Sequence, residues 1–292
     1  MAYTQKIVFY RIRNFSQKLN ATIEFIRQNI KPLGKSIIYI LGPMAILNGL
    51  LFSQYIDFMF GNMSNSDPVN VQNPFAFIAN PSYIGFLFLS SFSALLNFAI
   101  IFNFMKIYQK KFPEEISVTE VLNASWKDIL PLLVLGIMAT IIIVFGMFAF
   151  VIPGIYLAVV FSLSLPILFF ERGGIFEAIG RSFKLIRGKW WSTFGLLIVA
   201  SVLMYAVSMI FILPFYVFYF LSIFTLVEQT GFSADISSWW FQGGMTLSVM
   251  FMFLGSFLTY SIPMVALSFQ YFNLVERRES VGLMGEIEQL DK

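Results

Sequence analysis

Long uncharged runs of apolar residues alternate along the chain with short segments that carry its charges. A membrane-spanning helix needs roughly 20 predominantly apolar residues. The run 36–56 and the segment 83–105 each have the length of one span, whereas the run 129–170 has room for two. Pro153 and Gly154 lie in the middle part of this third run, and we predict that they form the turn of a hairpin.

The last two runs, 190–227 and 236–275, are each long enough for either one tilted helix or a tight hairpin. The placement of the 19 Lys and Arg residues favours single helices. These residues form four clusters, and none of them lies in 58–82 or in 228–235. Six spans put every cluster on one side of the membrane, which the positive-inside rule identifies as the cytoplasmic side. We therefore predict six spans arranged as three hairpins, with both termini in the cytoplasm.

Composition agrees with an integral membrane protein. The chain is 58% hydrophobic and 12% charged, whereas a soluble domain has about 25% charged residues. It contains no Cys and no His, which excludes thiolate and imidazole catalysis and metal sites built on these ligands. We expect no metal, no cofactor and no enzymatic activity. Nucleic-acid binding is not expected either, because no basic block is interleaved with exposed aromatic residues.

Basic amphipathic helices are predicted before the first and the fifth span. Apolar residues recur at helical spacing from Val8 to Ile30, and from Ile175 to Ile186, with Lys and Arg on the other side. Such helices typically lie in the headgroup plane of a membrane. The second helix presents a basic strip beside Trp190, which we predict to face lipid phosphates; the alternative is that these charges only hold the segment in the cytoplasm. The members of the strip are Arg181, Lys184, Arg187 and Lys189.

A short pattern recurs before three of the predicted spans. Its copies begin at Glu24, Glu120 and Glu177, and each has Ser or Asn at offset five and Lys at offset seven. Apolar residues at offsets two, six and nine share one face of a helix. We predict a threefold repeat of an interfacial helix followed by a transmembrane hairpin, with the three helices lying at one membrane depth. The alternative is a chance similarity between amphipathic helices.

Few polar residues fall inside the predicted spans. Four amides do so, and we interpret them as contacts between helices, each worth roughly 0.6 kcal/mol; the alternative is a polar substrate site. These amides are Asn97, Asn103, Gln270 and Asn273. Pro214 and Pro263 interrupt the fifth and sixth spans and are predicted to kink them, although paired breaks in transporters also mark substrate sites.

Part of the chain resembles a bacterial membrane family. The resemblance is carried by Ile152-Pro153-Gly154-Ile155-Tyr156, by Glu177-Ala178 followed by Arg181-Ser182, and by Arg187-Gly188 before Trp190. It is similar to the membrane domain found with some glycerophosphoryl diester phosphodiesterases and to related stand-alone six-span proteins. The catalytic barrel of those phosphodiesterases uses His residues, which this chain lacks. The resemblance therefore implies an accessory membrane module in the bacterial cytoplasmic (inner) membrane.

Together these patterns predict an all-α, polytopic helical membrane protein. Residues 1–34 are expected to form a cytoplasmic amphipathic segment, 35–275 the six spans and 276–292 a cytoplasmic tail. The expected function is that of a non-enzymatic accessory or scaffold protein that interacts with the lipid bilayer, and in particular with anionic lipid, or with other membrane proteins. The alternative is a transporter or channel for a small or lipidic substrate.

Overall fold

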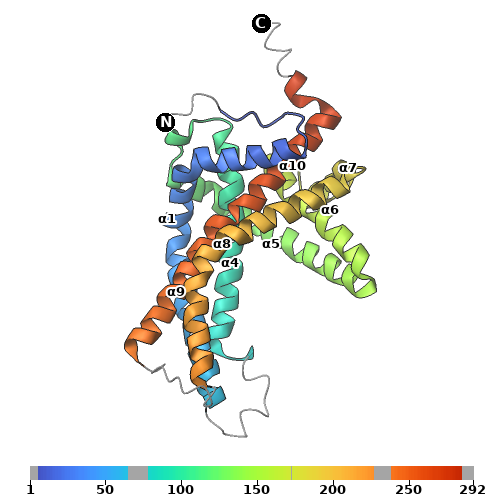
Figure 1. The fold of residues 1–292 in the computed structure, drawn as a ribbon. Coiled ribbons are helices and arrows are strands. Elements are labelled where there is room, and N and C mark those ends of the chain that lie inside the picture. The colour runs from blue at the N-terminus through green and yellow to red at the C-terminus, as the bar shows by residue number, and fades with distance from the viewer. Residues whose placement is uncertain (1–5, 65–77, 172, 227–237, 285–292) are drawn as a thin grey trace. The chain divides into compact units, whose positions relative to one another are not determined.

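The computed structural model describes residues 6–64, 78–171, 173–226 and 238–284 (Figure 1). All regular secondary structure in these ranges is helical. The elements are α1 (Phe15–Ser64), α4 (Pro81–Tyr108), the short 3-10 helix η1 (Pro113–Glu115), α5 (Val118–Ala149), α6 (Val151–Phe170), α7 (Ile175–Ile186), α8 (Trp190–Leu226), α9 (Trp239–Thr259) and α10 (Ser261–Glu279).

Six helices in the described ranges are long and apolar enough to cross a membrane. They are α1, α4, α5, α6, α8 and the segment Trp239–Glu279, which contains α9 and α10 and counts as one span. This confirms the predicted all-α class and the six spans. The segments 65–77 and 227–237, which include most of the predicted external loops, lie outside the described residues.

The predicted hairpin between the third and fourth spans is formed by α5 and α6, but its turn is at Phe150 rather than at Pro153 and Gly154. Phe150 has an extended backbone, which ends α5 and begins α6. Pro153 and Gly154 instead lie in the first turn of α6. Proline is tolerated there because the first N–H groups of a helix have no intrahelical partner. Gly154 lets the helices approach, since a Cβ there would lie 2.9 Å from the Met147 Cα.

The two remaining long runs differ from each other. The helix α8 is continuous from Trp190 to Leu226 and includes Pro214, which therefore does not end it. The last run is divided at Tyr260 into α9 and α10. Pro263 is the third residue of α10, again a position where its missing N–H costs no intrahelical bond.

The chain divides into two compact units. One unit contains residues 1–36, 98–204 and 260–292, and the other contains residues 37–97 and 205–259. These units are groups of residues that pack together. The segments predicted from the sequence, with boundaries at 34 and 275, instead describe which residues lie inside the membrane, and those boundaries stay predictions.

The second unit is held by aromatic packing and by a few polar contacts between helices. Phe52 on α1, Phe86 on α4 and Phe253 on α9 form a cluster with ring centroids 5.1–6.3 Å apart. Asn48 donates to the Ser93 hydroxyl, linking α1 to α4. These contacts connect three helices through both apolar and polar side chains.

The first unit has an aromatic core into which the N-terminal segment inserts. The Phe9 ring stacks on Tyr108 at 5.7 Å and lies 4.9 Å from Phe272. Phe25 on α1 packs against the same Tyr108 at 5.0 Å. The helical stripe predicted from Val8 therefore begins later, because residues 7–14 are not helical and bury Phe9 instead.

Candidate functional site

The three repeat copies are all helical and show the same burial pattern. They lie in the first half of α1, in the first turns of α5, and in α7. In each copy the residue after the Glu and the residue at offset five are buried. The residues at offset five, Asn29, Ser125 and Ser182, are fully buried and each donates to a carbonyl of its own helix at 2.7–2.8 Å. The repeat thus has a common inward face in the first unit, while the membrane depth of the copies stays a prediction.

The outward face of the repeat carries an exposed apolar residue followed by an exposed lysine. The apolar residues at offset six are Ile30, Trp126 and Phe183, which are 63%, 50% and 38% exposed. The lysines at offset seven are Lys31, Lys127 and Lys184, and all are exposed. Offset six was predicted to share a face with offsets two and nine, but the structure turns it outward in all three copies.

The glutamates of the repeat are less uniform. Glu120 and Glu177 are the third residues of α5 and α7, where an acidic residue is favourable because of the partial positive charge at a helix N-terminus. The Glu177 carboxylate accepts from the Gly174 N–H at 3.2 Å. Glu24 instead lies in the interior of α1 and accepts from the Gln28 amide. Two copies therefore begin a helix and one does not.

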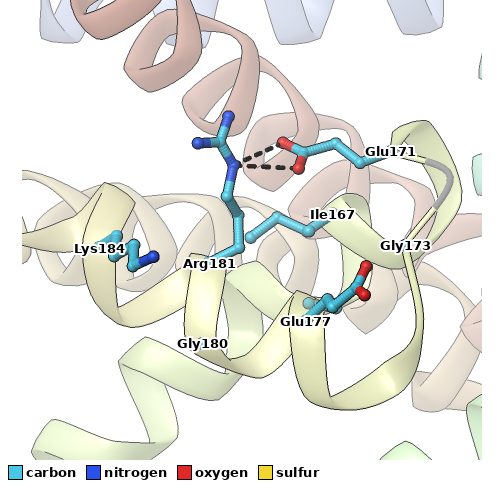
Figure 2. Close-up of a pocket in the computed structure, with 8 residues that line it drawn as sticks. Ile167, Glu171, Gly173, Glu177, Gly180, Arg181 and Lys184 are labelled. Carbon is cyan, nitrogen blue, oxygen red and sulfur yellow. Dashed lines mark hydrogen bonds and ion pairs between the residues drawn. The ribbon is translucent and has the colours of Figure 1, made fainter.

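One member of the predicted basic strip on α7, Arg181, is bound by carboxylates of neighbouring helices. Arg181 forms an ion pair with Glu171 at the end of α6, at 3.0 Å (Figure 2). It forms a second ion pair with Glu279 at the end of α10, at 2.5 Å. Burial by itself would lower the pKa of Arg181, but hydrogen bonds to Glu279 and Glu171 outweigh it and the pKa is raised. Arg181 is thus engaged by carboxylates and joins three helix ends, whereas Lys184, Arg187 and Lys189 are exposed.

A pocket of about 520 Å³ lies between the end of α6 and α7, beside Arg181 (Figure 2). Its lining residues are Ile167, Glu171, Gly173, Glu177, Ala178, Gly180, Arg181 and Lys184. Two carboxylates and two cations line it, so its formal charge is balanced. The Glu171 carboxylate also accepts from the Tyr271 hydroxyl at 3.0 Å, which fixes the carboxylate from the side of α10. This arrangement serves to position α6, α7 and α10.

Two buried cations lie deeper in the first unit. Lys18 on α1 is 2% exposed, and its ammonium donates to the Gln270 side-chain oxygen at 2.5 Å and to the Ser192 hydroxyl at 3.0 Å. Arg13 is buried beside the Phe269 ring, at 5.0 Å, and donates to the Phe9 and Val8 carbonyls. Burial lowers the pKa of Arg13, and the charge of Arg11 lowers it further.

Neither Lys18 nor Arg13 has a carboxylate within ion-pair distance in the part of the chain that the structure describes. Neutral oxygens hold both charges instead, which leaves the surroundings electropositive. Sequence reasoning treated both residues as topological charges. Spacing along the chain gives no signal of this, because the burial depends on residues of α8 and α10.

The four amides predicted inside the spans all contact other elements. Asn97 on α4 donates to the Phe257 carbonyl on α9 at 3.1 Å, and Asn103 donates to the Asp128 carboxylate on α5 at 2.7 Å. Gln270 donates to the Thr193 hydroxyl on α8 in addition to accepting from Lys18. The Asn273 oxygen accepts from the Arg13 backbone N–H at 2.8 Å. These are contacts of the kind that join helices.

Among the described residues, no three His, Cys, Asp or Glu side chains form a group that could hold a metal ion.

Part of the chain is similar to a known bacterial membrane protein. Over 77 residues the chain is 42% identical to a UPF0259 membrane protein of Pectobacterium carotovorum subsp. carotovorum (strain PC1). The matched region is 26% of this chain and 31% of that relative, so it spans about a third of the relative's length. The chain is a multi-pass membrane protein of bacterial type. No family model and no solved structure matches it. The resemblance to the membrane domain of phosphodiesterases is not addressed by this similarity and stays a prediction.

Proposed function

We propose that this protein is a non-enzymatic accessory protein of the cytoplasmic membrane that gathers anionic lipid at its cytoplasmic face. The observation that carries the proposal is the exposed pair of an apolar residue and a lysine, repeated as Ile30-Lys31, Trp126-Lys127 and Phe183-Lys184. An apolar side chain in the acyl boundary and a lysine reaching to the phosphates is the pattern of an interfacial helix. Each such lysine contributes about 1 kcal/mol of attraction to an anionic surface.

The proposal also accounts for the rest of the basic strip. Lys184, Arg187 and Lys189 are exposed, and they precede Trp191, which is itself 78% exposed. A tryptophan at this place is typical of an anchor at the membrane interface. Arg181 is not included, because its guanidinium is bound by Glu171 and Glu279. The lipid-binding face therefore consists of the repeat lysines, with Arg187 and Lys189 extending it on α7.

The test compares two variants that lose the same charge. Lys31→Gln/Lys184→Gln removes two repeat lysines, whereas Arg11→Gln/Arg278→Gln removes two exposed cations outside the repeat helices. Each protein is reconstituted in vesicles with spin-labelled phosphatidylglycerol or phosphatidylcholine, and the relative association constant of the two lipids is measured. We expect the selectivity for phosphatidylglycerol to fall about thirtyfold in the first variant, at about 1 kcal/mol for each of the two lysines, and to change little in the second. Equal effects of the two variants would refute the proposal, because they would reflect net charge alone.

A further inference from the structure

A second pocket, of about 340 Å³, lies at the corner between α4 and α5 in the first unit. Its lining residues are Asn103, Lys106, Ile107, Lys110, Lys111, Glu120, Ala124, Lys127 and Asp128. The volume is at the lower end of the range of small-molecule sites. Four lysines and two carboxylates face this space, so that positive charge is in excess.

The carboxylates of this pocket are already engaged. The Glu120 carboxylate pairs with the Lys111 ammonium at 2.8 Å, and the Asp128 carboxylate accepts from the Asn103 amide at 2.7 Å. Among the described residues, no ion pair is formed by the other three lysines, which are Lys106, Lys110 and Lys127. These ammonium groups can therefore turn toward a common anion.

Asn103 supplies a fixed donor at the inner wall. It is 3% exposed, and the Asp128 carboxylate holds one N–H of its amide group. A primary amide has a second N–H, and the hydrogen bond to Asp128 uses one of the two. An oxygen of an anion in the pocket can accept from the second.

The repeat provides an internal comparison for this pocket. The pocket beside α7 occupies the corresponding corner, with Glu177 in the place of Glu120 and Lys184 in the place of Lys127. At the position of Ala124, however, α7 has Arg181, which is bound by two carboxylates. The charges of the pocket beside α7 are therefore balanced by its own ion pairs, whereas the pocket beside α5 keeps lysines that no carboxylate neutralises among the described residues.

We propose that the pocket between α4 and α5 binds a phosphate group, with Lys106, Lys110 and Lys127 as its cationic donors and the Asn103 amide as its neutral donor. Ammonium groups are effective phosphate binders through charge-assisted hydrogen bonds. The inference deepens and rests on the proposed function, because it names one defined site within a face that otherwise attracts anionic lipid. The phosphate belongs to a lipid headgroup or to a soluble phosphate ester, since both present the same oxygens.

The experiment measures binding to the full-length protein in zwitterionic nanodiscs. Two probes separate the two sources: short-chain phosphatidylglycerol and sn-glycerol 3-phosphate. The pocket variant is Lys106→Gln/Lys110→Gln, which leaves Lys111 and Lys127 to maintain topology, and the control is Arg11→Gln/Arg278→Gln. We expect the pocket variant to bind about tenfold or more weakly and the control to bind like the wild-type protein. Loss of lipid binding alone identifies the headgroup as the source, and loss of glycerol phosphate binding alone identifies the soluble ester.

A measurement on the wild-type protein makes the test independent of how the variants fold. Hydrogen exchange is compared with and without each probe, and we expect protection in 103–111 and 118–128. If neither probe protects these segments, or if the pocket variant binds both probes as the wild-type protein does, the proposal is wrong. The Lys31→Gln/Lys184→Gln variant distinguishes the two proposals, because it should lose lipid selectivity in vesicles yet keep binding in this pocket.

Discussion

Replacing Gln270 tests whether the first unit depends on neutral groups to hold a buried cation. The Gln270 oxygen accepts from the Lys18 ammonium at 2.5 Å, and its amide donates to the Thr193 hydroxyl at 2.8 Å. The substitution Gln270→Leu keeps the approximate volume and removes both bonds. Lys18 then retains the Ser192 hydroxyl as its hydrogen-bond acceptor among the described residues.

The expected cost follows from these two bonds. A hydrogen bond to a charged group contributes about 1.5–3 kcal/mol, and a neutral bond between membrane helices about 0.6 kcal/mol. Part of this is offset because Leu is more apolar than Gln, so we expect a net loss of about 2 kcal/mol in the free energy of unfolding. In a Lys18→Met background no charge is left without a partner, and the same substitution should cost only about 0.6 kcal/mol.

The four proteins of this double-mutant cycle are unfolded by SDS in mixed micelles, and their free energies of unfolding are compared. Gln109→Leu is the control, because Gln109 is exposed and the change should stay within about 0.5 kcal/mol. We expect a coupling energy between Lys18 and Gln270 of more than about 1 kcal/mol. Additivity of the two substitutions would refute the reasoning, since it would mean that Gln270 does not stabilise the buried charge.

Three further predictions concern packing, ion pairing and topology. Gly154→Ala should destabilise the α5–α6 hairpin by about 1–3 kcal/mol in the same assay, because the added Cβ meets the Met147 backbone; Gly136→Ala, where the space is open, should be neutral or slightly stabilising. Arg181→Gln should lower stability by about 1–2 kcal/mol, between the values for surface and buried pairs, while recovery of anionic lipid stays unchanged; a loss of lipid with full stability would show instead that Arg181 binds headgroups. A single cysteine at Ser233 should react with an impermeant reagent in intact cells and one at Ser280 should not, and the reverse pattern would contradict the predicted orientation.

The spans could be predicted from the sequence because they depend on local composition. An uncharged run of sufficient length forms a helix in a membrane whatever its neighbours are, since its backbone must be satisfied internally. The placement of charges also predicted α8 as a single helix, and α8 is indeed continuous through Pro214. The division of the last run at Tyr260 could not be predicted in this way. Both runs contain one proline and similar apolar residues, so the difference depends on packing against other helices.

The partners of the charged residues also lie beyond what spacing along the chain can indicate. Arg181 was predicted to belong to a basic strip that faces lipid, but its guanidinium pairs with Glu171 and Glu279, which are 10 and 98 positions away. Lys18 was counted among the charges that set topology, although Gln270, which binds it, is 252 positions away. Periodicity identifies the face of a helix, whereas the identity of what meets that face is a tertiary property.

Two copies of the repeat, in α5 and α7, line pockets that differ in their charge balance. Burial is the same in the copies at offsets one and five, and these inward positions keep each helix packed in the first unit. Offset four is only partly buried, and there the copies differ: Ala124 in α5 and Arg181 in α7. The Arg181 guanidinium at this position pairs with carboxylates at the ends of α6 and α10, so the positive charge that it adds is neutralised within the fold. The residue at this half-buried position thus distinguishes the two pockets. The pocket between α4 and α5 is the one that we propose to bind a phosphate group, whereas in the pocket beside α7 the protein's own carboxylates pair with Arg181.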